Sequence, residues 1–325
     1  MPEKRANLNF SVHIPPDPTD DDLLFARQLG VECVFTAVKE NQTSVEALQD
    51  LKRKVEDAGL KLNNVSNTEV WKCDKIILNL PGRDEKIEAY KSYLRNLSKV
   101  GITTTTFTWE QAGVWSSQER TESRFASARQ VKMAELDARP VTHGREYSEE
   151  EIWDNFEYFM REIIPVAEET GVRLALHPND PPVPSLGGVP CLIHSLASYK
   201  RAFQIADSPQ LGMEFCCGCW LEGGSEGFGD ILEGIRWCSE QGRILIVHFR
   251  NIDAPLPNFV EAFLDDGYMD MYKLMKILVE TEYNGTVTLD HTPTIVPSFG
   301  RGTGTGYAIG YMRALRERAE DELYG

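Results

Sequence analysis

The sequence lacks any long hydrophobic run. No stretch of about 18 consecutive apolar residues occurs, and a membrane-spanning helix needs about that length. The first residues, MPEKRANLNFSVHIPPDP, also contain no apolar core of the length found in signal peptides. We therefore expect a cytoplasmic protein that has no membrane partner.

Basic residues are scarce relative to acidic ones. The 325-residue chain has 34 Lys and Arg against 50 Asp and Glu, and its formal net charge is -16. A nucleic-acid binder needs a basic face for phosphate contacts, so this balance argues against a nucleic-acid partner. The apolar share of 42% is ordinary for a globular protein and argues against disorder.

Cysteine is neither abundant nor paired in a disulfide pattern. The seven cysteines are an odd number spread through a large chain, and Cys216, Cys217 and Cys219 crowd into four positions. This spacing suits free thiols or metal ligands better than a disulfide framework.

The chain does contain a regular alternation of β-branched runs with segments of helical period, which is typical of βα units around a parallel sheet. The predicted strands are residues 9–13, 31–37, 60–65, 102–108, 172–177, 211–216, 243–249 and 285–290. The predicted helices are residues 19–29, 44–58, 83–99, 149–169, 195–206, 227–240, 268–281 and 307–320. Thr19 and Ser148, each followed by acidic residues, are expected helix starts.

Eight strands, each followed by a helix, predict an α/β fold of the (β/α)8 TIM-barrel type. A doubly wound open sheet is the alternative, but it would rarely need eight uninterrupted units. No Pro/Gly/Ser-rich linker divides the chain, so we expect residues 1–325 to form a single domain. The longest interruption, residues 109–147, follows the fourth strand and is predicted to be a lid or a partner-binding loop.

Four successive predicted strands end on potential metal ligands. These residues are His177, Cys216, His248 and Asp290. Catalytic groups of TIM barrels lie at the carboxyl ends of the strands, and neighbouring strands are about 4.8 Å apart. One metal ion could therefore bind all four, although Cys217 or Cys219 could replace Cys216. The sulfur ligand favours Zn or Fe(II), and Mn(II) is also feasible.

Two other motifs allow alternative interpretations. The C-x-x-C pattern at Cys216 and Cys219 would suggest redox chemistry in a thioredoxin-like fold, which does not have eight βα units. The segment GRGTGTGY, residues 300–307, lies too near the end of the chain for a dinucleotide-binding fingerprint. It is predicted to be a phosphate cradle or a mobile loop that moves Tyr307, and Arg301 is compatible with either.

The chain resembles the D-mannonate dehydratase family. HPNDPPVPSLGGVP resembles the family's HPDDPP segment, MEFCCGC resembles its MTMCTGS-like segment, and VHFRN, DGYMDMY, LDH and GTGYAIG follow in the same order. IPPDP, LKRKVEDAGL and YKSYLRNLSKVGI extend the resemblance to the N-terminal half. It implies a xylose-isomerase-like TIM barrel that binds Mn(II) or Fe(II) and converts D-mannonate to 2-dehydro-3-deoxy-D-gluconate and water in hexuronate breakdown. It also implies a homo-oligomer.

The resemblance also implies roles for particular residues. It assigns the metal to His177, Cys216, His248 and Asp290, and assigns catalysis to His291 and Tyr307. The elimination needs a base for the proton α to the carboxylate and an acid for the leaving hydroxyl, and either residue could take either role. His291 has the better intrinsic pKa for a base.

Further residues are candidates for binding the sugar acid. They are Arg250 and Arg301 for the carboxylate, Asn179 and Asp180 for hydroxyl groups, and Trp115 in the interruption. Arg250 has an alternative role in a strand-end salt bridge. The chain departs from the family at Asn179, at Pro293 and around TWEQAGVWSSQER, and these departures concern the substrate more than the metal. The alternative functions are a metal-dependent sugar isomerase or epimerase and a non-catalytic binding barrel.

Overall fold

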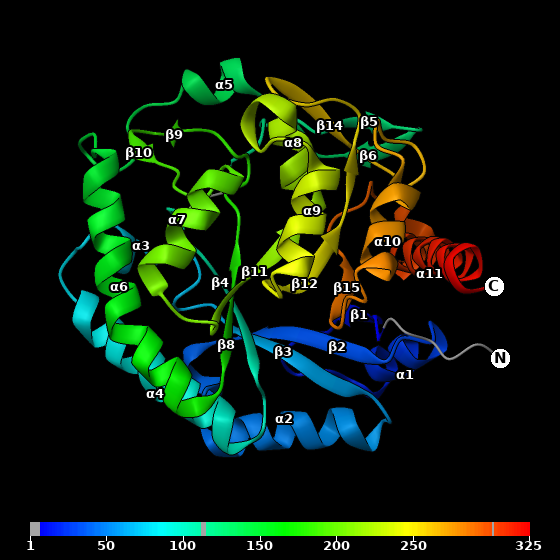
Figure 1. The fold of residues 1–325 in the computed structure, drawn as a ribbon, viewed down its shortest axis with the longest axis horizontal. Helices are drawn as coiled ribbons and strands as arrows, with labels where there is room; N and C mark the ends of the chain where they lie inside the picture. The colour runs from blue at the N-terminus through cyan, green and yellow to red at the C-terminus, as the bar shows by residue number, and fades with distance from the viewer. Residues whose placement is uncertain (1–6, 112–114, 301) are drawn as a thin grey trace.

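The computed structural model describes residues 7–111, 115–300 and 302–325, and its centre is an eight-stranded parallel sheet rolled into a barrel (Figure 1). The barrel strands are β1 (Asn9–His13), β2 (Cys33–Val38), β3 (Lys61–Asn67), β4 (Thr104–Thr108), β8 (Arg173–His177), β11 (Leu211–Cys216), β12 (Ile244–Phe249) and β15 (Thr286–Leu289). All eight predicted strands are confirmed, and so is the TIM-barrel fold.

The barrel is nearly closed. The hydrogen-bonded order is β3-β2-β1-β15-β12-β11-β8-β4, and the end strands β3 and β4 lie against each other. Between them, the Asn64 amide donates a 2.9 Å hydrogen bond to the Thr106 hydroxyl. Apolar side chains of the strands, such as Phe10, Leu174 and Val247, are fully buried. A large apolar side chain contributes roughly 1.5–3 kcal/mol when buried, so these strands anchor a rigid frame.

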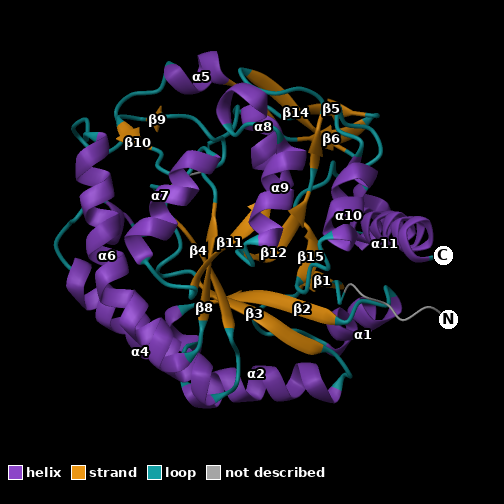
Figure 2. Cartoon of the chain, viewed as in Figure 1, coloured by secondary structure: helices purple, strands orange, loops and turns teal. Residues whose placement is uncertain are grey.

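Helices form the outer layer around the strands (Figure 2). Those that follow barrel strands are α1 (Asp20–Gln28), α2 (Val45–Asp57), α4 (Arg83–Lys99), α6 (Glu149–Thr170), α7 (Leu196–Ala206), α9 (Ile231–Glu240), α10 (Met271–Glu280) and α11 (Gly302–Tyr324). Thr19 and Ser148 cap α1 and α6 as expected, each in a capping box with the acid three residues later. Short helices η1 (Glu40–Gln42), α3 (Asp74–Ile77) and η2 (Pro297–Phe299) lie in the connections.

Two helical segments differ from the sequence prediction. An additional helix, α8 (Cys217–Gly227), follows β11, where the sequence analysis predicted no element. Gly218 is required there, because a Cβ atom would lie 1.7 Å from the Arg250 Nε atom. The glycine-rich segment is also helical from Gly302 onward, so the expected mobile loop is wrong over residues 302–307.

Residues 109–147 contain short elements that pack beside the carboxyl end of the barrel. They are β5 (Thr121–Ser123), β6 (Ala126–Ala128), β7 (Gln130–Lys132) and α5 (Met133–Asp137). β7 pairs with β14 (Asn258–Ala262), which in turn pairs with β13 (Asn251–Ile252), and Ser127 forms a bridge with Thr294 after β15. Figure 1 shows β5, β6 and β14 side by side.

A second small hairpin, β9 (Ser185–Leu186) with β10 (Val189–Pro190), follows β8. Among the residues that the structure describes, no helix has the length and hydropathy needed to cross a bilayer.

Candidate active site

Three of the four predicted metal ligands lie at the ends of neighbouring strands, and the fourth follows directly after one. His177 ends β8, Cys216 ends β11 and pairs in register with His248 on β12, and Asp290 follows β15. The ligand atoms of Cys216, His248 and Asp290 all lie within 4.8 Å of one another. His177 joins this group, since its ring centroid is 5.3 Å from that of His248 and its ligand atom lies within 4.8 Å of the Cys216 sulfur.

Hydrogen bonds orient the two imidazoles of this group. Nδ1 of His177 lies 2.6 Å from the Pro178 carbonyl oxygen, which can only accept a hydrogen bond, so Nε2 is left as the ligand atom. Nε2 of His248 lies 2.7 Å from a Glu214 carboxylate oxygen, so its Nδ1 faces Asp290 at 3.5 Å. This buried Nδ1 has no hydrogen-bond partner in the described part of the chain. An unpartnered nitrogen aimed at a carboxylate and a thiol fits a metal ligand.

Sequence reasoning missed Glu214. The residue lies two positions before Cys216 on β11, and side chains two apart on a strand point to the same face. It is buried, and its carboxylate lies within 4.8 Å of the ligand atoms of His177 and His248. Period-two spacing from the predicted ligand could have indicated it, because an acid in a barrel core needs a partner.

The surroundings of Cys216 favour the thiolate form of its side chain. It caps the N-terminus of α8, where its sulfur accepts a 3.4 Å hydrogen bond from the Cys219 backbone N–H. Burial alone would raise the pKa of the Cys216 thiol, but hydrogen bonding with Cys219 and the charge of Arg250 lower it well below its usual value. The charged form is the one that binds metal ions.

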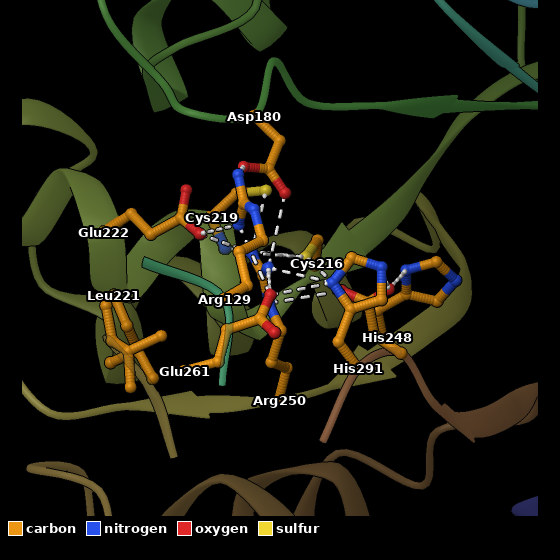
Figure 3. Close-up of polar contacts among 12 residues, drawn as sticks. Arg129, Asp180, Cys216, Cys219, Leu221, Glu222, His248, Arg250, Glu261 and His291 are labelled. Carbon is orange, nitrogen blue, oxygen red and sulfur yellow. Dashed lines mark hydrogen bonds and ion pairs between the residues drawn. The ribbon is translucent and has the colours of Figure 1, made fainter. Parts of the chain in front are cut away.

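A buried ionic network lies beside the ligand group (Figure 3). The fully buried Arg250 guanidinium lies 2.6 Å from Glu222, 3.1 Å from Glu261 and 3.2 Å from Asp290. Arg129, from the segment between β6 and β7, lies 2.6 Å from Asp180 and 3.3 Å from Glu261. Arg129, Glu222 and Glu261 were not predicted from the sequence, because they lie outside the barrel strands, on the β6–β7 connection, α8 and β14, and only the fold brings these segments together.

His291 lies at the rim, between the network and the ligand group. Its side chain is 50% exposed, with Nδ1 2.9 Å from Glu261 and Nε2 3.2 Å from Asp290. The charge of Asp290 raises the pKa of His291, burial opposes this, and the hydrogen bond that Nδ1 donates to Glu261 raises it further. His291 faces a pocket of about 350 Å³, which we call the rim pocket; its lining residues are Arg120, Arg129, Glu261, Leu289, Asp290, His291, Thr292 and Thr305.

Tyr307 lies on α11, and no described contact joins it to His291. Its hydroxyl donates a short hydrogen bond to Asp265, and its ring packs against Phe263 and Tyr311. Burial and the hydrogen bond to Asp265 raise the pKa of Tyr307. This arrangement keeps the phenol protonated at neutral pH.

Most of the predicted substrate-binding residues are engaged with the protein itself. The Asn179 amide donates to the Trp109 carbonyl oxygen and accepts from the Ile193 N–H at 2.7 Å. Asp180 faces Arg129 and Arg250, and Arg250 forms the buried salt bridges that were its alternative role. Trp115 is only 4% exposed. Arg301 lies outside the described residues.

Comparison with solved structures first defines the fold, which is the (β/α)8 barrel. A mannonate dehydratase structure from Streptococcus suis serotype 2 superimposes with a TM-score of 0.84 at 24% identity, covering 98% of this chain and 95% of that one. A structure of L-ribulose 3-epimerase matches with a TM-score of 0.62 at 12% identity, covering 97% and 96%. At these identities, the matches show the fold alone.

The chain belongs to the D-mannonate dehydratase (UxuA) family, whose model matches residues 21–128 and 123–319. A mannonate dehydratase from Streptococcus agalactiae serotype V is 31% identical over 309 residues, covering 86% of each chain. One from Streptococcus pneumoniae is 28% identical over 328 residues, covering 91% of this chain and 87% of the relative. The resemblance found in the sequence is therefore confirmed.

Proposed function

We propose that this protein is a hydro-lyase that removes water from D-mannonate to give 2-dehydro-3-deoxy-D-gluconate in hexuronate breakdown. The observation that carries this proposal is the position of His291, which faces the rim pocket and directly contacts Asp290 of the ligand group. Membership of the D-mannonate dehydratase family supports the reaction. We further propose a single-domain, cytoplasmic homo-oligomer.

We propose that His177, Cys216, His248 and Asp290 hold a divalent ion, Mn(II) or Fe(II). Their donor set of two imidazoles, a thiolate and a carboxylate fits such an ion, and the unpartnered His248 Nδ1 faces the point where the others converge. When bound, the ion supplies Lewis acidity, which stabilises the negative charge that develops next to the substrate carboxylate.

His291 is proposed as the base that removes the α proton. Its half-exposed imidazole reaches the rim pocket, and Glu261 accepts a hydrogen bond from its Nδ1. This bond holds Nε2 toward the ligand group and stabilises the imidazolium that forms when the proton is taken. Arg250 and Arg129 in turn hold Glu261 in place.

Tyr307 is proposed as the acid that protonates the departing hydroxyl. Its raised pKa keeps the phenol protonated. Asp265, which accepts the hydrogen bond from this phenol, also forms an ion pair with Arg124, with 3.1 Å between Nη1 and Oδ2. To protonate a group in the rim pocket, the phenol must first leave Asp265. Asn179, Asp180 and Arg250 are proposed to position the loop after β8 and the network.

The decisive experiment supplies the purified protein with Mn(II) and D-mannonate, and follows the 2-keto-3-deoxy acid colorimetrically and epimers by NMR. We expect keto-deoxy acid from D-mannonate. A panel of other aldonates and of aldoses tests the substrate. If epimers or isomers form and no aldonate yields keto-deoxy acid, the isomerase or epimerase alternative replaces the dehydratase, because both begin with the same proton removal.

Glu214 should control metal affinity through His248. Because the carboxylate fixes the ring orientation and raises the basicity of Nδ1, Glu214→Ala should weaken Mn(II) binding about 10- to 100-fold. Glu214→Gln should retain part of the affinity, since an amide oxygen still accepts the hydrogen bond. Equilibrium dialysis measures both, and equal affinity in Glu214→Ala and wild type would contradict this role.

Glu261 should set the pH dependence of the reaction. Its hydrogen bond raises the pKa of His291, and a base must be deprotonated, so kcat/KM should increase with pH through that pKa. Glu261→Gln removes the negative charge, so the rising limb should move to lower pH by about one unit. Rate profiles between pH 5 and 9 measure this, with Tm recorded to confirm folding. If the rising limb of the kcat/KM profile has the same pH midpoint in Glu261→Gln and wild type, His291 is not a base whose pKa Glu261 raises.

A further inference from the structure

The rim pocket contains acidic groups that would repel a sugar acid. Asp290 and Glu261 both line it, and the substrate proposed above carries a carboxylate. Besides the proposed metal ion, a side-chain cation that faces the pocket would favour the binding of an anion there. Two arginines line the pocket, Arg120 and Arg129, and they differ in what surrounds them.

Arg129 is already neutralised by the protein. Its guanidinium lies 2.6 Å from Asp180, 3.3 Å from Glu261 and 3.5 Å from Glu222, and its side chain is 12% exposed. It also donates to the Ser116 hydroxyl and the Trp115 carbonyl oxygen. Its charge and its N–H groups therefore serve the buried network.

Arg120 has no such partners. It is exposed, and no carboxylate in the described ranges 7–111, 115–300 and 302–325 forms an ion pair with it. Its Nε and Nη2 donate to the hydroxyl and carbonyl oxygen of Ser127, at 2.8 and 3.0 Å. The Ser127 carbonyl oxygen also accepts a 2.7 Å hydrogen bond from Thr294, three residues after His291. The guanidinium is thus fixed to the segment that carries His291, with its charge uncompensated.

We propose that Arg120 binds the carboxylate of the substrate and selects sugar acids over neutral sugars. The inference rests on the proposed function, because it takes the substrate to be an aldonate. Of the two described arginines that line the pocket, only Arg120 forms no ion pair with an Asp or Glu side chain. A guanidinium can bind a carboxylate through parallel N–H groups. Ser127 limits the entropy lost on binding, since it already holds the side chain in place.

The test compares Arg120→Met and Arg120→Lys with wild type. We expect Arg120→Met to lower kcat/KM for D-mannonate about 10- to 100-fold, mainly through KM, and Arg120→Lys to recover part of the loss. Arg145→Met is the matched control, because Arg145 pairs with Glu151 outside the pocket, at 2.8 Å. It should behave as wild type.

A second measurement tests whether Arg120 acts through its charge. Inhibition by D-gluconate, an anion, should weaken in Arg120→Met by the same factor, whereas inhibition by the neutral polyol D-mannitol should not change. If Arg120→Met dehydrates D-mannonate with wild-type KM, or loses affinity for both inhibitors equally, the inference is overturned while the proposed function stands. If the wild type dehydrates no aldonate, the proposed function fails, and thermal-shift titrations with the two inhibitors still test Arg120.

Discussion

Replacing Cys216 or His177 with alanine should abolish both metal binding and dehydration. Each side chain contributes one donor to the group at the barrel rim, and, against the effect of burial, hydrogen bonding with Cys219 and the charge of Arg250 lower the pKa of the Cys216 thiol. Losing the Lewis acid removes several kcal/mol of transition-state stabilisation, which corresponds to a rate loss of about a thousandfold or more. Metal content by elemental analysis and turnover of D-mannonate measure the two effects.

The neighbouring cysteines supply the controls for this experiment. Cys217 belongs to none of the described ligand groups, so Cys217→Ala should keep its metal. The Cys219 sulfur does lie within 4.8 Å of His177 and Cys216, and Cys219→Ser distinguishes a ligand from a hydrogen-bonding neighbour. Full metal content in Cys216→Ala would show that the site is wrongly assigned, and loss only in Cys219→Ser would move the sulfur ligand to that residue.

Replacing His291 with glutamine should lower kcat by about a hundredfold to ten-thousandfold and leave metal content unchanged. Proton transfer by a positioned side chain contributes a factor of this size, and glutamine cannot accept the proton. The residue contacts Asp290 and Glu261 at the rim, and glutamine preserves much of its size. Rates under saturating D-mannonate and metal analysis of the same samples measure the result.

His143→Gln is the comparison for this variant. That imidazole lies 3.1 Å from Asp74, away from the rim pocket, and its loss should leave kcat unchanged. A wild-type kcat in His291→Gln would exclude the residue as the base. A loss of metal together with activity would instead show that His291 acts through the ligand group.

The sequence alone predicted the frame of the site well. The alternation of β-branched runs with segments of helical period located all eight barrel strands, and the parallel arrangement then implied that His177, Cys216, His248 and Asp290 lie together. The equivalent ends of parallel barrel strands meet at one rim, and this does not depend on the conformation of the loops. Capping residues such as Ser148 act within one helical turn, so they too can be recognised locally.

The tertiary structure decided what surrounds that frame. The burial of Arg250 among Glu222, Glu261 and Asp290, and the contact of Glu214 with His248, depend on residues far apart in sequence. The sequence could not distinguish a paired arginine from an unpaired one, because pairing depends on how distant segments of the chain pack together. The sequence by itself therefore determined the barrel and the position of the four proposed ligand residues at one rim. Only the fold decided which charges are paired, and it leaves Arg120 without an ion pair to a carboxylate among the described residues.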